Sequence, residues 1–346
     1  MRYLNSYLAF GLGVSFGALA KECTTTETGE EALLVTSPDQ LDVFEGCTAI
    51  SGDIVIDSSY SGDFILSGVT TFAGNISTDA EDPAQDLGSV ELPDLVDLGT
   101  INLGSVVNAH LPKVEQAVDI VLVQASSSGE VDLGSLVEAN NVRVQGSWTT
   151  INVASLKTVN QVAQFCGVSG CGIYPDTNPP FISVDLPALE TTNHLEVAGT
   201  VESVSVPNLE VVGFQEPEIA YVQGLRINIQ ESEKDLDFDA PKLHTLNGTL
   251  EVYGGVSGLS LGALREGNVG VTLNARAPLN VYSTLRTTSH FYLWGTLESI
   301  ELPNFVDLGS VSLAYEPRLP CNETLYRLWQ LVPGSSDPNK CTEIEV

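Results

Sequence analysis

Basic residues are scarce in this chain of 346 residues. It has 14 Lys and Arg against 45 Asp and Glu, which gives a formal net charge of −31 and a pI near 4.1. Nucleic acids and anionic membranes attract clusters of Lys and Arg, so this composition excludes both as partners. Apolar residues make up 43% of the chain, enough for a large core. We therefore expect a folded, acidic protein that either stays soluble in crowded surroundings or meets cations or basic partners.

Long apolar runs are also lacking. The one candidate, Tyr7–Ala20, is too short to cross a bilayer comfortably, follows the positively charged Arg2 and ends in Ala-Leu-Ala before Lys21. We interpret residues 1–20 as a signal peptide. The alternative, a buried helix, is weaker because glycine and serine interrupt any amphipathic stripe. The sequence therefore predicts a secreted protein without a transmembrane segment.

Motifs of known catalytic sites are absent. The sequence has no G-x-S-x-G, no H-E-x-x-H and no phosphate-binding glycine loop. The four histidines are too far apart in sequence to share a metal: His110, His194, His244 and His290. We expect no enzymatic activity, no metal and no cofactor. A pair of carboxylates for glycoside hydrolysis stays an open alternative. With 45 acidic residues, some must lie near one another by chance, so proximity alone would mean little.

Cysteines and glycosylation sequons agree with export. The six cysteines fall as three sequence-local pairs, and we predict this connectivity from locality alone among fifteen pairings: Cys23 with Cys47, Cys166 with Cys171, and Cys321 with Cys341. A metal or redox role for the second pair is the minor alternative. Three sequons predict N-glycosylation at Asn75, Asn247 and Asn322.

A six-residue phrase recurs along the chain and reads apolar, polar, apolar, often Pro, any residue, apolar. The ten copies are VELPDL (90–95), AHLPKV (109–114), VDLGSL (131–136), INVASL (151–156), VDLPAL (184–189), VSVPNL (204–209), FDAPKL (238–243), LSLGAL (259–264), the worn LNVYST (279–284) and IELPNF (300–305). We call the third residue of each copy its anchor. Most anchors follow one another at about twenty residues, and two longer gaps predict insertions near 163–181 and 215–235, both leaving the stack at one corner.

Each coil also has a second apolar half. After the anchor Leu92, apolar residues follow at Leu95, Leu98, Ile101 and Leu103. Alternation with period two indicates strands, and no coil has room for a helix. We predict an all-β fold, a right-handed β-solenoid or leucine-rich-repeat-like stack of about twenty-residue coils, each with two strands and two bends, and with disulfide-capped ends. The expected regions are 21–80 as N-terminal cap and first irregular coils, 81–320 as solenoid and 321–346 as C-terminal cap.

The residue before each anchor should point outward. Down the stack these residues form one predicted polar column: Glu91, His110, Asp132, Asn152, Asp185, Ser205, Asp239, Ser260, Asn280 and Glu301. A solvated sheet face is the favoured interpretation, and a ligand-binding face is the alternative. Aromatic residues of late coils offer a second surface that could stack on sugars, although packing within the sheet is favoured: Tyr253, Tyr282, Tyr292 and Trp294. Trp148 and Trp329 are expected to pack a bend and the C-terminal cap.

A parallel β-helix polysaccharide lyase or hydrolase is the main enzymatic alternative. Such an enzyme gathers basic residues beside Asp in order to bind and deprotonate an acidic sugar. Here the arginines are scattered over the coils: Arg143, Arg226, Arg265, Arg276 and Arg286. An acidic protein is also a poor host for an anionic polysaccharide, so this alternative is the weakest.

The phrases from VELPDL to IELPNF, together with the opening segment QLDVFEGCTAISGDIVI (40–56), resemble the receptor L-domain-like repeats of fungal cell-wall organisation glycoproteins, the sporulation-specific protein 2 family. The resemblance covers the mature chain. It implies a glycosylated, non-enzymatic protein of the cell wall or outer plasma-membrane face. Family members carry a lipid anchor, but no apolar tail precedes Val346, so anchorage stays open. A receptor-like module that binds a wall glycan or a secreted protein is the alternative.

Overall fold

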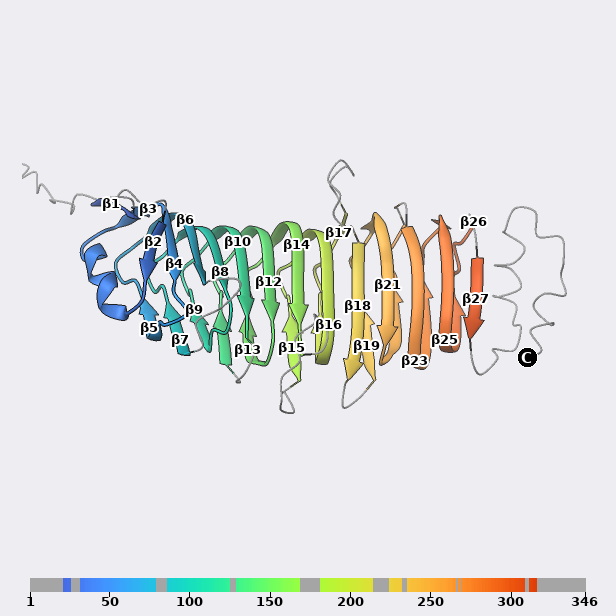
Figure 1. Cartoon of the computed structure of the whole chain (residues 1–346). Helices are drawn as coiled ribbons and strands as arrows, with labels where there is room; N and C mark the ends of the chain where they lie inside the picture. The colour runs from blue at the N-terminus through green and yellow to red at the C-terminus, as the bar shows by residue number, and fades with distance from the viewer. Residues whose placement is uncertain are drawn as a thin grey trace, which may run out of the picture.

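The computed structural model describes residues 21–25, 32–78, 86–124, 129–168, 181–213, 224–231, 235–265, 267, 269–308 and 311–315. These residues form a parallel β-solenoid of about 11 turns. Figure 1 shows the coils stacked in chain order along one axis, from the blue N-terminal coils to the red strand β27. The predicted all-β solenoid is confirmed. At roughly 4.8 Å per coil the stack is about 50 Å long.

Each coil contributes strands to a long face and to a second face, which we call the anchor face because its strands end next to the anchors. The long face contains β2 (Ala32–Val35), β4 (Asp53–Ile56), β6 (Thr71–Thr78), β8 (Asp97–Leu103), β10 (Gln116–Val123), β12 (Glu138–Gln145), β14 (Thr158–Cys166), β16 (Thr191–Ser205), β18 (Gly224–Glu231), β21 (Gly248–Gly254), β23 (Val269–Ser283), β25 (His290–Glu301) and β27 (Val311–Tyr315).

The anchor face contains β5 (Ser61–Ile65), β7 (Asp86–Glu91), β9 (Asn108–His110), β11 (Gly129–Asp132), β13 (Trp148–Asn152), β15 (Ile182–Asp185), β19 (Leu236–Asp239) and β22 (Val256–Leu261). The long strands β16, β23 and β25 turn the corner and supply this face with their C-terminal parts. Every ladder within the described residues is parallel, because each coil repeats the direction of the one before it.

A third, short side separates the two faces, where the sequence predicted only two strands and two bends. It contains β1 (Glu22–Thr24), β3 (Ala49–Ser51), β17 (Val211–Val212), β20 (Thr245–Leu246), β24 (Thr287–Thr288) and β26 (Asp307–Leu308). The first residues of β6, β8, β10, β12, β14 and β16 continue this side. Each coil is therefore three-sided.

The repeated phrase has a specific structural cause. Its anchor carbonyl accepts a hydrogen bond from the backbone N–H three residues later, as from Leu136 to Leu133 at 3.0 Å and from Leu95 to Leu92 at 3.4 Å. This is a β-turn, and proline directly after the anchor presets its first central residue. The turn carries the chain from the anchor face to the short side, so the phrase encodes one corner of the coil.

Apolar residues at the predicted inward positions form one continuous core. In the coil of Leu92 the side chains of Leu95, Leu98, Ile101 and Leu103 are all buried. The earlier segment 33–78 is also coiled, and it buries these apolar residues: Leu41, Phe44, Ile50, Ile54, Ile56, Phe64, Leu66 and Ile76. A single coil cannot bury these side chains alone, so the stability of the fold depends on stacking.

The corner between the long and anchor faces depends on glycine. Gly254 and Gly295 have φ angles of +84° and +85°. A Cβ atom there would lie 1.8 Å from the carbonyl oxygen of Ile229 and 2.1 Å from that of Ala275. Only glycine allows the two backbones to approach so closely at this corner.

The N-terminal end is closed by a cap. The 3-10 helix η2 (Pro38–Phe44) buries Leu41 and Phe44 against the first coils, and the disulfide Cys23–Cys47 ties β1 to the segment that follows the helix. This pairing is the one predicted. The C-terminal region 321–346, with Cys321, Cys341 and Trp329, lies outside the described residues.

Both predicted insertions need correction. Residues 163–166 complete β14, and 224–231 form the regular strand β18 rather than a loop. The stretches outside the described residues, 169–180 and 214–223, lie between β14 and β15 and between β17 and β18. They therefore interrupt the coils at different corners, not at one.

Candidate functional site

The predicted outward column on the anchor face is divided into three blocks. Adjacent strands align Glu91 with His110, Asp132 and Asn152 in the first block. The second block pairs Asp185 with Ser205. The third aligns Asp239, Ser260, Tyr282 and Glu301. Among the described strands no hydrogen-bonded ladder joins β13 to β15 or β16 to β19, although each pair of strands lies side by side. The backbone ladder under the expected column is therefore interrupted twice.

The degenerate repeat copy LNVYST (279–284) was aligned with the other copies two residues too early in the sequence. Ser260 pairs with Tyr282 and Leu261 with Ser283, so Tyr282 takes the place predicted for Asn280. Leu279 and Val281 are buried, as the phrase requires. A slip of two residues keeps every side chain on the same face of a strand, and the inside–outside pattern therefore could not reveal it.

In the first block, polar side chains bond to one another. Asn152 Nδ2 donates to Asp132 Oδ1 at 2.8 Å, and the same oxygen accepts the backbone N–H of Gly134 at 3.1 Å. In the neighbouring outward row, Asn108 Nδ2 donates to Ser89 Oγ at 3.2 Å. Glu91, His110 and Asp132 are half-buried, so this block fits the solvated-face interpretation.

The third block borders a shallow groove of about 430 Å³. Its outward residues lie in two adjacent rows: Asp237, Gly258, Asn280 and Ser299 in one, and Asp239, Ser260, Tyr282 and Glu301 in the other. The groove crosses β19, β22, β23 and β25, which is roughly 14 Å at 4.8 Å per strand. The groove brings four residues of the predicted column (Asp239, Ser260, Asn280 and Glu301) together with Tyr282, for which packing was the favoured role.

The long face carries an exposed aromatic strip, which we define as His290, Tyr292 and Trp294. These alternate residues of β25 point outward, and the side chains of Tyr292 and Trp294 are 47% and 65% exposed. The rings of His290 and Tyr292 lie 5.1 Å apart. The favoured role in sheet packing stays a prediction for Tyr292 and Trp294, whose side chains are largely exposed. In contrast, Trp148 is buried at the predicted bend, and its Nε1 donates to Gln145 O at 3.0 Å.

A polar ladder on the long face was missed by the sequence reasoning. We call it the Arg–Glu ladder: Arg143, Gln164, Glu196, Arg226 and Glu251. Gln164 Nε2 donates to Glu196 Oε2 at 2.7 Å, and Arg226 lies 3.6 Å from Glu196 and 3.5 Å from Glu251. Each member stands between two inward apolar residues, as Arg143 does between Val142 and Val144. That tripeptide pattern is the signal that could have revealed the ladder.

His194 lies next to this ladder and is 6% exposed. Burial lowers its pKa from the ordinary value. Glu196 opposes the shift, while Arg226 and Arg143 reinforce it. Within the described part of the chain its Nδ1 has no hydrogen-bond partner. Burial therefore favours the neutral form of His194 over the charged form. His110, His244 and His290 belong to other strands or turns and do not join it.

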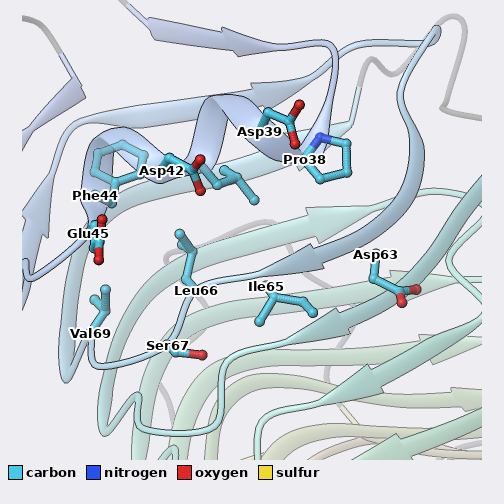
Figure 2. A pocket seen from close by; sticks show the side chains of 11 residues that line it. Pro38, Asp39, Asp42, Phe44, Glu45, Asp63, Ile65, Leu66, Ser67 and Val69 are labelled. Atoms are coloured by element: carbon cyan, nitrogen blue, oxygen red, sulfur yellow. The ribbon is translucent and has the colours of Figure 1, made fainter.

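A second concavity lies at the N-terminal cap, between η2 and β5. It has a volume of about 340 Å³. Figure 2 shows the carboxylates of Asp39, Asp42 and Glu45 along the helix side, with Asp63 across from them and Ile65 between. Among the described residues none of these acids forms an ion pair. The concavity lies along the interface between the N-terminal cap and the first coils.

The remaining predicted sites are placed only in part. Cys166 is disulfide-bonded, while Cys171 lies outside the described residues. Asn75 is half-buried in β6, and Asn247 donates its side-chain amide to Gly213 O at 2.7 Å. Asn322 lies outside the described residues. Glycosylation stays a prediction at all three sequons.

Metal and membrane features were sought within the same part of the chain. There, no three side chains of His, Cys, Asp or Glu gather closely enough to hold a metal ion. None of the helices described there has the length and apolar character needed to span a bilayer.

Comparisons with known proteins return no relative. No protein-family model matches the chain, and no curated protein or solved structure matches it either. The sequence resemblance to cell-wall organisation glycoproteins therefore stands on the repeat residues alone.

Proposed function

We propose that this chain is a non-enzymatic, secreted or surface glycoprotein that contributes to fungal cell-wall organisation by binding wall glycan. The export pattern at residues 1–20, the sequons and the Cys23–Cys47 disulfide support an extracellular setting. Solenoids offer extended surfaces to extended ligands, and a polysaccharide is such a ligand.

The aromatic strip carries this proposal. Burying a large aromatic side chain stabilises a protein by roughly 2–3 kcal/mol, so leaving Trp294 and Tyr292 in solvent forgoes that gain. Exposed apolar side chains that lie together mark binding surfaces. Alternate residues of one strand are about 6.6 Å apart, and His290, Tyr292 and Trp294 therefore extend over about 13 Å along β25.

Neighbouring residues give the strip the character of a sugar-binding surface. Tyr292 pairs with Thr272 and Trp294 with Asn274, so hydroxyl and amide groups lie beside the rings. The ring of His290 occupies the space above Gly270, where a Cβ would come within 2.0 Å of it. Sugar C–H groups pack against aromatic faces while sugar hydroxyls bond to such polar neighbours. The arrangement suits a neutral polysaccharide chain lying flat.

A sedimentation assay with insoluble wall polysaccharides tests the proposal. We expect wild-type protein to bind saturably and the double variant Tyr292→Ala/Trp294→Ala to bind at least about tenfold more weakly, a loss of about 1.4 kcal/mol. The matched control is Val43→Ala, which changes a side chain of comparable exposure (64%) in η2.

The variants must retain the wild-type melting temperature, which is expected because these side chains are exposed. Binding that is unchanged in the double variant, or lost equally in Val43→Ala, would contradict the proposal. Release of new reducing ends from the polysaccharide would show hydrolysis and contradict the non-enzymatic role.

A further inference from the structure

The groove over β19, β22, β23 and β25 is a second surface on the solenoid, separate from the aromatic strip. β25 contributes to both: Tyr292 and Trp294 precede the corner at Gly295, whereas Ser299 and Glu301 follow it. The groove therefore lies on the anchor face of the same late coils whose long face carries the strip. One rigid set of coils presents two chemically different surfaces.

Tyr282 forms the aromatic part of the groove. Its side chain is 41% exposed, and its Cε1 lies 3.4 Å from the position that a Cβ on Gly262 would take. The ring therefore lies beside Gly262 of the preceding coil. Because the ring is packed on one side and still substantially exposed, it offers a surface to a ligand.

Carboxylates surround this ring. Glu301 lies on the strand after Tyr282, and Asp239 lies two strands before it, with Ser260 between. Within the described residues neither Asp239 nor Glu301 forms a hydrogen bond or an ion pair through its carboxylate. From the described residues, the Asp237 carboxylate accepts only the Ser257 hydroxyl, at 2.8 Å.

The polar side chains of the groove are suited to hydroxyl groups as well as to charge. Ser299 Oγ donates to Asn280 Oδ1 at 2.6 Å, and Asn280 Nδ2 donates to Glu298 at 2.9 Å. The Ser260 hydroxyl lies between Asp239 and Tyr282. A ligand with hydroxyls, a flat C–H face and positive charge would use all of these groups at once.

We propose that this groove binds a cationic glycan, a polymer of unacetylated amino sugars, with Tyr282 against the sugar ring and Asp237, Asp239 and Glu301 facing its ammonium groups. The net charge of −31 adds long-range attraction for such a polymer and repels polyanions. The inference rests on the proposed extracellular glycan-binding role for its setting, but it uses none of the strip residues.

Calorimetric titration with defined oligomers tests the site. Glucosamine oligomers are compared with N-acetylglucosamine oligomers of the same length, at a mildly acidic pH where the free amine is protonated. We expect at least about tenfold tighter binding of the glucosamine oligomer, and weakening as salt rises. A tetralysine peptide serves as the polycation without sugar, and we expect it to bind at least about tenfold more weakly.

Four variants locate the site. Tyr282→Ala and the pair Asp239→Asn/Glu301→Gln should each weaken glucosamine binding about tenfold. The matched control, Asp39→Asn/Glu45→Gln, removes two charges from the N-terminal concavity and should leave binding unchanged. The Tyr292→Ala/Trp294→Ala protein should also bind the oligomer normally, so failure of the proposed function and failure of the groove are separable.

Equal affinity for acetylated and free oligomers would overturn the proposal, as would tetralysine binding as tightly as the sugar. An equal loss in the N-terminal control would show that only total charge matters and would also overturn it.

Discussion

The first and third outward blocks on the anchor face arise from the same repeat but differ in chemistry. In the first, the half-buried Asp132 accepts a hydrogen bond from the exposed Asn152. In the third, Asp239 and Glu301 are exposed beside Tyr282, over a groove. The inward residues of both are mostly apolar and buried, although the polar Ser283 takes an anchor position in the third block. The inward positions therefore determine the coil structure. The outward positions can vary, and they form either a surface of hydrogen-bonded side chains or a surface available to a ligand.

The largest effect should be the same in both regions, because it concerns the core. Leu133 and Leu261 are both anchors and fully buried. Replacing either by Ala should lower the free energy of unfolding by about 3 kcal/mol, through lost burial and a cavity. Urea unfolding of Leu133→Ala and Leu261→Ala measures this. A large loss in one and almost none in the other would show that the coils are not equivalent.

The disulfide should matter chiefly to the early region. Cys23 and Cys47 are separated by 24 residues, and removing such a cross-link costs about 3 kcal/mol in the chain-entropy model. Hydrogen exchange of Cys23→Ser/Cys47→Ser should show faster opening in β1, β3 and η2 than in β23 and β25. Uniform acceleration along the whole stack would contradict a local cap.

His194 should make stability depend on pH. Its folded-state pKa lies below the ordinary value of 6.5 because it is buried, so the unfolded chain takes up a proton that the folded chain does not. Stability should therefore fall as the pH drops below about 6.5, with a slope of at most about 1.4 kcal/mol per pH unit.

Unfolding measured as a function of pH checks this prediction. The variant His194→Gln should show a flatter profile in that window. The same slope in His194→Gln as in wild type would refute the assignment.

The smallest effects should distinguish the two outward blocks directly. Asp132→Ala breaks two hydrogen bonds and should cost about 1 kcal/mol. Glu301→Gln breaks none within the described residues and should change the free energy of unfolding by less than about 0.5 kcal/mol. If Glu301→Gln proved the more destabilising, the third block would be a structural element and not a free surface.

Much of the fold could be predicted from the sequence, because period-two alternation and a β-turn after each anchor are local properties. Ile101 and Leu103 were placed correctly by spacing alone, and Cys23 with Cys47 by proximity. The third side was missed because its strand segments, such as Asp97 and Leu98, are only two residues long. A segment of that length is too short to show an alternating pattern. The two-residue register shift at Val281 was also missed, because a shift of two leaves each side chain on the same face of the strand.

The binding surfaces were less predictable, since exposure depends on which coils lie side by side. Tyr292 and Trp294 alternate like any other strand residues, and only the stacked structure shows that their rings are uncovered. The Arg–Glu ladder required the register of five strands before Arg226 could be placed between Glu196 and Glu251. Register of this kind is a long-range property that no single repeat contains.

Oxidative footprinting of the protein bound to insoluble wall glycan tests the central claim most directly. Hydroxyl radicals modify exposed aromatic side chains, so the method compares Trp294 and Tyr292 with and without glycan. The account predicts clear protection at both residues, with unchanged, low reactivity at the buried Trp148. Undiminished oxidation of Trp294 in the glycan-bound protein would contradict it.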